Sequence, residues 1–136
     1  MEDLEIRIET ARKRLNELNF ESLSEIDKVL ITVYELEAEV NNGGFDQYYF
    51  NSSGNLAYYA PQALKIIGAP KMARIVADAN QKFGINGPPR DWDERQEKLE
   101  IITEDEDQWE ELDSEFYSYP EDIEKLLAEY IGKNPN

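Results

Sequence analysis

Apolar residues recur along most of the chain with the three-to-four-residue spacing of amphipathic helices. A first helix is predicted over residues 3–18, where the apolar positions are Leu4, Ile8, Ala11, Leu15 and Leu18. A second is predicted from Ser24 to Val40, because Ser24 followed three residues later by Asp27 resembles a capping box and leads into an apolar stripe. We expect Asn41 to Gly44 to end this helix, since glycine readily adopts the left-handed conformation that terminates helices.

The rest of the chain predicts shorter helices. The spacing continues over residues 55–67, where Pro61 requires a first turn or a break, and over residues 70–83, where Pro70 is placed as a first helical residue. The stretch from Gly84 to Arg90 is the main predicted loop, because it contains two adjacent prolines after a glycine. Beyond it we expect three short helices, at residues 92–102, at residues 109–116, and from Pro120 to Gly132.

No stretch shows the clear two-residue alternation of a half-buried strand, so an all-α fold is predicted, with about six to eight helices, several of them short. A chain of 136 residues is long enough to form a core of its own. There is no internal repeat, and the connections are too short to separate two domains. We therefore expect residues 1–136 to form a single compact domain.

Charge restricts the classes of partner. The chain has 14 Lys and Arg against 30 Asp and Glu, a formal net charge of −16, which repels nucleic acid and anionic membranes alike. No apolar run approaches the roughly 18 residues of a spanning helix, and the first residues lack a signal-peptide pattern. Together with the absence of cysteine, these features favour a cytoplasmic protein that binds neither nucleic acid nor membrane directly.

The residues that usually carry catalysis are scarce. The chain has no histidine, the commonest general base and metal ligand. Gly43 and Gly44 lack the spacing of a phosphate-binding glycine motif, and Ser52 and Ser53 have no base nearby in sequence. Carboxylate pairs such as those near Asp105 are expected by chance in so acidic a chain. We therefore expect no catalytic residues, no metal ligands and no cofactor.

Most of the excess negative charge lies in residues 91–115, which contain thirteen acidic and two basic residues, a net charge of −11. If this segment were helical throughout, it would present one carboxylate per about 3 Å of axis, against one phosphate charge per about 1.7 Å of duplex DNA. Such a surface suits a site built for a nucleic-acid backbone. The candidate partner-binding residues are Asp91, Asp93, Glu94, Glu97, Glu100, Glu104, Asp105, Glu106, Asp107, Glu110, Glu111 and Asp113.

The same acids also have an ordinary structural interpretation. Residues 103–106 resemble a capping box that begins at Thr103, and acids in a first turn are favoured by the helix dipole. Asp91 with Arg95 is predicted to form an i, i+4 ion pair, as is Glu94 with Lys98. A solvated helix face thus explains part of the cluster, but it does not explain the excess of acids over bases.

An almost uncharged block of glycines, amides and aromatics occupies residues 41–54. Phe45, Tyr48 and Tyr49 have the spacing of one helical face and would fill a corner between helices. The alternative is that these tyrosines and the amides around them, together with the tyrosines at 58–59, line a groove for a partner. The structural corner is the favoured interpretation.

This block also carries a family resemblance. Residues 42–54 (NGGFDQYYFNSSG), followed by YAPQAL at 59–64 and IGA at 67–69, resemble the signature of the bacterial DNA-mimic protein C-terminal domain family. The resemblance extends over about residues 22–131, and it implies an all-α fold. The signature residues, which are also those of the alternative pocket, are Gly43, Gly44, Phe45, Gln47, Tyr48, Tyr49, Phe50, Asn51, Ser52 and Gly54.

For the namesake of the family, the resemblance implies an acidic dimer that occupies the DNA-binding face of a transcription factor. Our leading hypothesis is therefore a non-enzymatic, acidic interaction protein that binds a basic partner, preferably a DNA-binding protein. A homodimer is compatible with this hypothesis. The second is a peptide- or small-molecule-binding module, for example in toxin neutralisation or stress, that uses residues 41–59. The weakest is a carboxylate-dependent metal enzyme.

Overall fold

The computed structural model describes residues 2–134 and contains no strand in that range, so the all-α prediction is confirmed. The chain forms a single compact domain. Its helices, with short 3₁₀ helices labelled η, are α1 (Glu2–Glu17), η1 (Phe20–Ser22), α2 (Glu25–Phe50), η2 (Ser52–Leu56), α3 (Ala60–Ile66), α4 (Pro70–Gln81), α5 (Trp92–Ile102), α6 (Glu110–Tyr117) and α7 (Ile123–Lys133). None of the described helices is long and apolar enough to cross a membrane.

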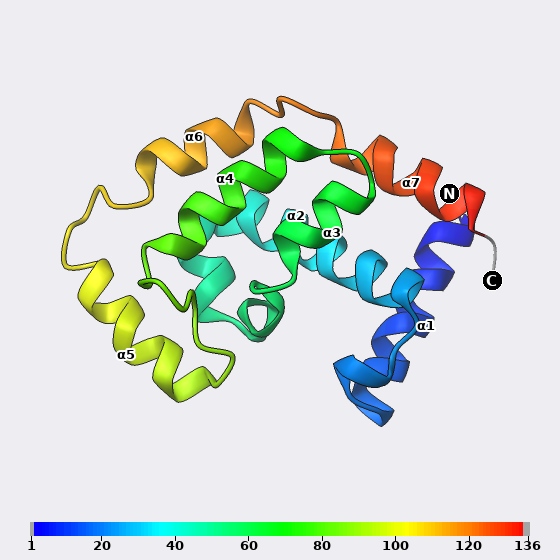
Figure 1. The fold of residues 1–136 in the computed structure, drawn as a ribbon, viewed down its shortest axis with the longest axis horizontal. Helices are drawn as coiled ribbons and strands as arrows, with labels where there is room; N and C mark the ends of the chain where they lie inside the picture. Colours follow the sequence, from blue (N-terminus) through cyan, green and yellow to red (C-terminus); the bar gives the residue numbers. More distant parts are fainter. Residues whose placement is uncertain (1, 135–136) are drawn as a thin grey trace.

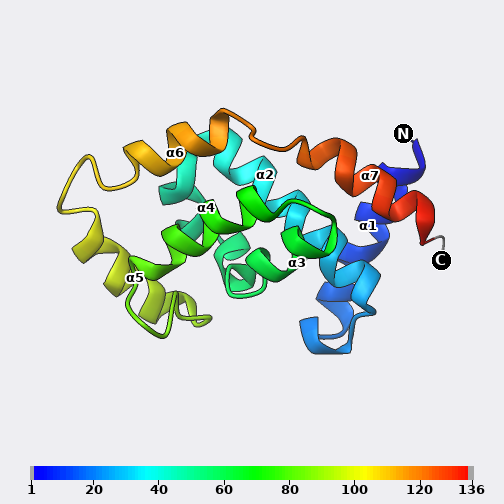
Figure 2. The ribbon, with the colours of Figure 1, turned by 45° about the horizontal axis from the view of Figure 1, so that its top comes forward.

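The long helix α2 is the centre of the fold. It contacts α1, α3, α5, α6, α7 and η2, while α4 packs on α3 and α6. Figures 1 and 2 show α1 and α7 at one end of an elongated molecule and α5 and α6 at the other. The acidic residues 91–115 therefore occupy the end of the molecule that is far from α1 and α7.

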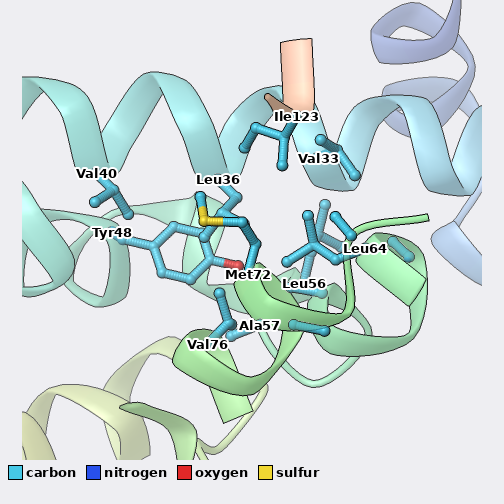
Figure 3. Packing of buried hydrophobic residues seen from close by; sticks show 14 of the residues in the cluster. Val33, Leu36, Val40, Tyr48, Leu56, Ala57, Leu64, Met72, Val76 and Ile123 are labelled. Carbon is cyan, nitrogen blue, oxygen red and sulfur yellow. The ribbon is translucent and has the colours of Figure 1, made fainter. Parts of the chain in front are cut away.

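The core lies between α2 and the α3–α4 pair. Figure 3 shows its centre. Helix α2 contributes Val33, Leu36, Val40 and Tyr48, and α4 contributes Met72 and Val76. The other labelled residues are Leu56 at the end of η2, Ala57 directly after it, Leu64 of α3 and Ile123 of α7. All of these side chains are buried. Each large apolar side chain that is removed from water in this way contributes about 1.5–3 kcal/mol. The helices thus pack around one continuous core.

The predicted end of the second helix is a kink. Helical geometry fails at Gly43 (φ −158°, ψ 20°) and Gly44 (φ 75°, ψ −176°), and the chain then resumes a helical path to Phe50. The glycines interrupt the helix as predicted, but they redirect it and do not end it. The aromatic residues that follow are thereby aimed into the core.

Some predictions at helix ends are confirmed and others are wrong. The break that Pro61 allowed in the predicted helix over residues 55–67 exists, because the segment is divided into η2 and α3, with Pro61 in the first turn of α3. The last helix begins at Ile123, capped by Asp122, and not at Pro120. The expected capping box at Thr103 does not exist: Thr103 ends α5, its hydroxyl donates to the Leu99 carbonyl at 2.9 Å, and residues 103–109 form turns.

Candidate functional site

The kink in α2 is joined to α6 by Asp113. The Phe45 N–H, which the kink frees from the helix, donates to Asp113 Oδ1 at 2.8 Å. A Cβ atom at Gly44 would lie 2.6 Å from Asp113 Oδ2, so only glycine allows this approach. Burial raises the pKa of Asp113, an effect that the Phe45 N–H opposes and the nearby charge of Asp46 reinforces. Asp113, one of the predicted partner-binding acids, is thus half-buried and engaged within the fold.

The aromatic residues of the block are core residues in this structure. Phe45, Tyr48 and Tyr49 are completely buried, and Tyr49 donates its hydroxyl proton to Asn80 Oδ1 at 2.6 Å. The Phe45 ring lies 6.1 Å from that of Trp109, between centroids, in an aromatic cluster that also includes Phe83 and Phe116. These three side chains do not line a groove.

Arg95 anchors α5 to the end of α2. Its side chain is fully buried, and its guanidinium donates to the carbonyls of Tyr49 (2.7 Å), Asn51 (3.1 Å), Pro89 (3.0 Å) and Arg90 (3.2 Å). A Cβ atom at Gly54 would lie 2.7 Å from Arg95 Nε. The absence of a side chain at the signature residue Gly54 therefore leaves room for the guanidinium of Arg95, one of the two basic residues in the acidic segment.

The predicted ion pair between Asp91 and Arg95 is thus wrong. Asp91 instead accepts from the Glu94 N–H at 3.0 Å and caps the start of α5. The i, i+4 spacing suggested a surface pair, but Arg95 also lies four residues before the buried Leu99, which places both on the inward face of the helix. The i, i+4 spacing of Arg95 and Leu99 is the sequence signal that could have placed Arg95 on the buried face of α5.

Trp92 and Gln96 hold the start of α5 against Phe50. Trp92 Nε1 donates to the Phe50 carbonyl at 2.8 Å, and Gln96 Nε2 donates to the same oxygen at 3.0 Å. The Phe50 and Trp92 rings meet edge to face, with centroids 6.1 Å apart, and about half of each side chain remains exposed. Together with Arg95, these contacts fix α5 on a rigid base.

The acidic segment is exposed over most of its length. Figure 1 shows α5, the turns at 103–109 and α6 following one another around the end of the molecule. The turns divide the segment, so the uninterrupted helix used for the comparison of charge density does not form. The predicted partner-binding acids that are exposed are Asp91, Asp93, Glu94, Glu97, Glu100, Glu104, Asp105, Glu106, Asp107, Glu110 and Glu111.

These acids are distributed over both helices and the turns. On α5, Asp93, Glu97 and Glu100 follow at i, i+4 and i+7, which places them on one face with about 6 Å and then about 4.5 Å of helix rise between them. A depression of about 430 Å³ lies between the kink of α2 and α6, and its acidic lining residues are Asp46, Asp105, Glu106, Glu110 and Asp113. Among residues 4–134, whose side chains the structure describes, no group of three or more acidic side chains has the arrangement of a metal site.

The polar end of the signature block lies elsewhere. Ser52, Ser53 and Asn55 line a cleft of about 630 Å³, together with Arg12 from α1 and Arg90 from the loop before α5. Ser53 is itself committed to the fold, because its hydroxyl donates to the Tyr48 carbonyl at 2.9 Å. The signature residues are therefore divided between an aromatic corner and the wall of a cleft.

Comparison with protein families gave a match. The family model described as DMP19-like protein matches residues 21–134, from η1 to the end of α7, and so includes both the kink of α2 and the whole acidic segment. Neither the curated proteins nor the solved structures gave a match.

Proposed function

The chain belongs to the DMP19-like family, and we propose that it is a non-enzymatic DNA mimic of the bacterial cytoplasm. Its acidic end, defined here as α5, the turns at 103–109 and α6, would occupy the DNA-binding surface of a basic partner protein. The observation that carries this proposal is the exposure of eleven of the twelve candidate acids on that end.

The local charge balance supports the proposal. The two basic residues of the segment are Arg95, which is turned inward and bonded to four carbonyls, and Lys98, which is exposed. The charged groups that a partner meets on this surface are therefore almost all anionic. Carboxylates accept paired hydrogen bonds from arginine, the residue on which DNA-binding proteins rely for phosphate contacts. Charge complementarity of this kind gives fast association that weakens steeply with salt.

Rigidity of the acidic end also supports the proposal. Arg95, Trp92 and Asp113 each join this end to α2 through a hydrogen bond to the main chain. A backbone that is already fixed loses little freedom on binding, which lowers the entropic cost of association. The path of the backbone that carries the acids is then set before the partner arrives.

The proposal is tested by capturing partners with two variants that have equal charge. One replaces Glu97, Glu100, Glu106 and Glu110 on the acidic end with glutamine, and the control replaces Glu5, Glu9, Glu17 and Glu129 elsewhere on the surface. All eight residues are exposed, so both variants should keep the fold and the same net charge. Partner proteins bound at low salt are identified with the wild type and with each variant.

The proposal predicts that the wild type and the control capture the same DNA-binding proteins and that excess duplex DNA displaces them. The variant of the acidic end should lose them. Equal capture by the two variants, or partners that ignore both duplex DNA and salt, would contradict the mimic.

A further inference from the structure

The cleft beside η2 combines charged, amide and apolar walls. It lies between α1 with η1 on one side and η2 with the loop before α5 on the other, elements that Figure 1 places along one side of the molecule. Its volume of about 630 Å³ is within the range of sites that hold small ligands. It shares no lining residue with the acidic depression near Asp113.

The two arginines of the cleft are held by the same pair of contacts. Arg12 donates to Glu35 at 2.7 Å and lies over the Tyr34 ring at 5.5 Å, whereas Arg90 donates to Glu21 at 2.5 Å and lies over the Tyr58 ring at 4.2 Å. Each guanidinium is therefore fixed by a carboxylate and an aromatic face. Since a guanidinium has five N–H donors, each retains donors for a ligand.

Amides and apolar side chains complete the lining. Asn16 and Asn55 are exposed, and their side chains make no hydrogen bond to the side chains described, those of residues 4–134, or to the main chain of residues 2–134. A carboxamide can both donate and accept, which matches the two groups of a peptide bond. Leu15 is the partly exposed apolar residue of the cleft, and Phe20, Ile31 and Leu56 lie behind it as part of the buried core.

We propose that this cleft binds a short, extended peptide segment that carries one apolar and one acidic side chain. Asn16 and Asn55 would pair with its main chain, Leu15 would contact its apolar side chain, and Arg12 and Arg90 would bind its carboxylate. The site is independent of the proposed mimicry, because it uses none of the exposed acids of the acidic end.

The charge of the lining favours a peptide over a free anion. Glu21 and Glu35 balance Arg12 and Arg90, so the lining has no net charge with which to attract a simple anion to a strongly acidic protein. A peptide adds main-chain hydrogen bonds and apolar burial to the contact of its carboxylate. These additional contacts are what a neutral, mixed lining can supply.

The test is a nuclear magnetic resonance titration of the ¹⁵N-labelled chain with two probes. The first is the capped tetrapeptide acetyl-Ala-Leu-Asp-Ala-amide, and the second is succinate, which offers carboxylates alone. The tetrapeptide should produce saturable shifts at the Arg12 and Arg90 Nε–H groups and at the side-chain amides of Asn16 and Asn55. Succinate at the same concentration should produce little change.

Variants assign any binding to the cleft. Arg12→Gln should weaken the tetrapeptide about tenfold, the loss expected for one charge-assisted hydrogen bond. Lys13→Gln, a neighbouring exposed cation outside the lining, should bind as the wild type does. Asn16→Phe, which fills the cleft from an exposed position on α1, gives a second test that leaves both ion pairs in place.

Three results would overturn the proposal. Succinate could shift the same resonances as strongly as the tetrapeptide, which would indicate a site for simple anions. The tetrapeptide could fail to shift the cleft resonances at millimolar concentration. The folded Arg12→Gln and Asn16→Phe variants could both bind with unchanged affinity. Each result can be read without any partner of the acidic end.

Discussion

At the residue scale, the signature glycines are explained by what lies against them. Gly44 has φ +75° with an extended ψ, a conformation almost restricted to glycine, and the carboxylate of Asp113 fills the space beside it. Gly54 faces the Arg95 guanidinium. The glycines therefore belong to two polar contacts, each of which connects α2 to a different part of the acidic end.

Gly44→Ala should destabilise the fold by about 2–4 kcal/mol, because backbone strain of about 1–3 kcal/mol adds to a clash with Asp113. Gly84→Ala is the matched control, since Gly84 also has a positive φ (+108°) but has open space around its Cβ position. Urea unfolding of both variants measures the difference. Equal losses would show that strain alone, without the approach of Asp113, accounts for the glycine.

Arg95→Met should destabilise the fold by at least about 3 kcal/mol. Methionine keeps much of the side-chain volume but removes a donor from four carbonyls. The Tyr49 and Asn51 carbonyls keep a second donor, whereas each carbonyl left without any donor costs about 1–3 kcal/mol unless water enters. Arg74→Met, which removes an exposed arginine paired with Asp78 and Glu115, should cost less than about 1 kcal/mol. Chemical denaturation would contradict the account if both losses were similar.

The hydrogen bonds of single side chains could be predicted from the sequence only where both partners lie close together in the chain. The cap at Ser24 could be predicted because its partner, the Asp27 N–H, is three residues away. The role of Asp113 depends on an N–H group 68 residues away, and the role of Arg95 depends in part on two carbonyls more than 40 residues away. A single sequence offers no spacing rule for such contacts, so both residues were assigned to the surface.

At the element scale, apolar periodicity predicted the helices and misplaced some of their ends. The stripe of α2 is long and regular, so its existence was clear, but whether two glycines end or bend a helix depends on what receives the freed N–H. Here α6 supplies Asp113 for that purpose. The predicted helices at residues 92–102 and 109–116 agree with α5 and α6 to within one residue, but Thr103 was wrongly interpreted as a cap because it suits a helix start in sequence. The start of α7 was missed because Pro120 also suits a helix start, whereas the helix begins at Ile123.

The start of α7 gives a direct test of one such correction. Asp122 accepts from the Lys125 N–H at 3.1 Å, so Asp122→Ala should cost about 1 kcal/mol through loss of the helix cap. Pro120 is exposed and precedes the helix, so Pro120→Ala should change stability by less than about 0.5 kcal/mol. Thermal unfolding followed by circular dichroism compares the two, and a larger loss at Pro120 would restore the helix start predicted from sequence.

At the scale of the whole molecule, stability should increase as the pH falls from 7.5 to 5.5. Burial raises the pKa of Asp113 and of Glu37, so each binds its proton more tightly in the folded chain than in the unfolded chain. The free-energy cost of burying their charged form decreases as the pH falls toward their raised pKa values, because the carboxylates become protonated. Repulsion among the excess acids of a chain with net charge −16 decreases over the same range.

The melting temperature measured at both pH values, at low salt and in 0.5 M NaCl, checks this expectation. Salt should reduce the part that comes from surface repulsion and leave the part that comes from burial. Asp113→Asn, which can still accept the Phe45 N–H, should decrease the pH effect. A melting temperature that falls steadily between pH 7.5 and 5.5 would show that carboxylates stabilised by their charge dominate.

The candidate site could be predicted as a segment but not as a surface. Composition alone located the excess acids in residues 91–115, because charge density is a property of the sequence. Their division into two helices around one end of the molecule depends on the turns at 103–109 and on the anchors at Arg95 and Asp113. The cleft beside η2 could not be predicted from the sequence, since residues from four separate parts of the chain form it.

The central claim is that the acidic end and duplex DNA compete for one surface. The most direct measurement adds this protein to a captured DNA-binding partner in complex with labelled duplex, and follows both the displaced DNA and the mass of the complex that remains. The account predicts that DNA and the protein exclude each other, and that glutamine at 97, 100, 106 and 110 abolishes the displacement. A stable ternary complex of partner, duplex DNA and this protein would contradict it.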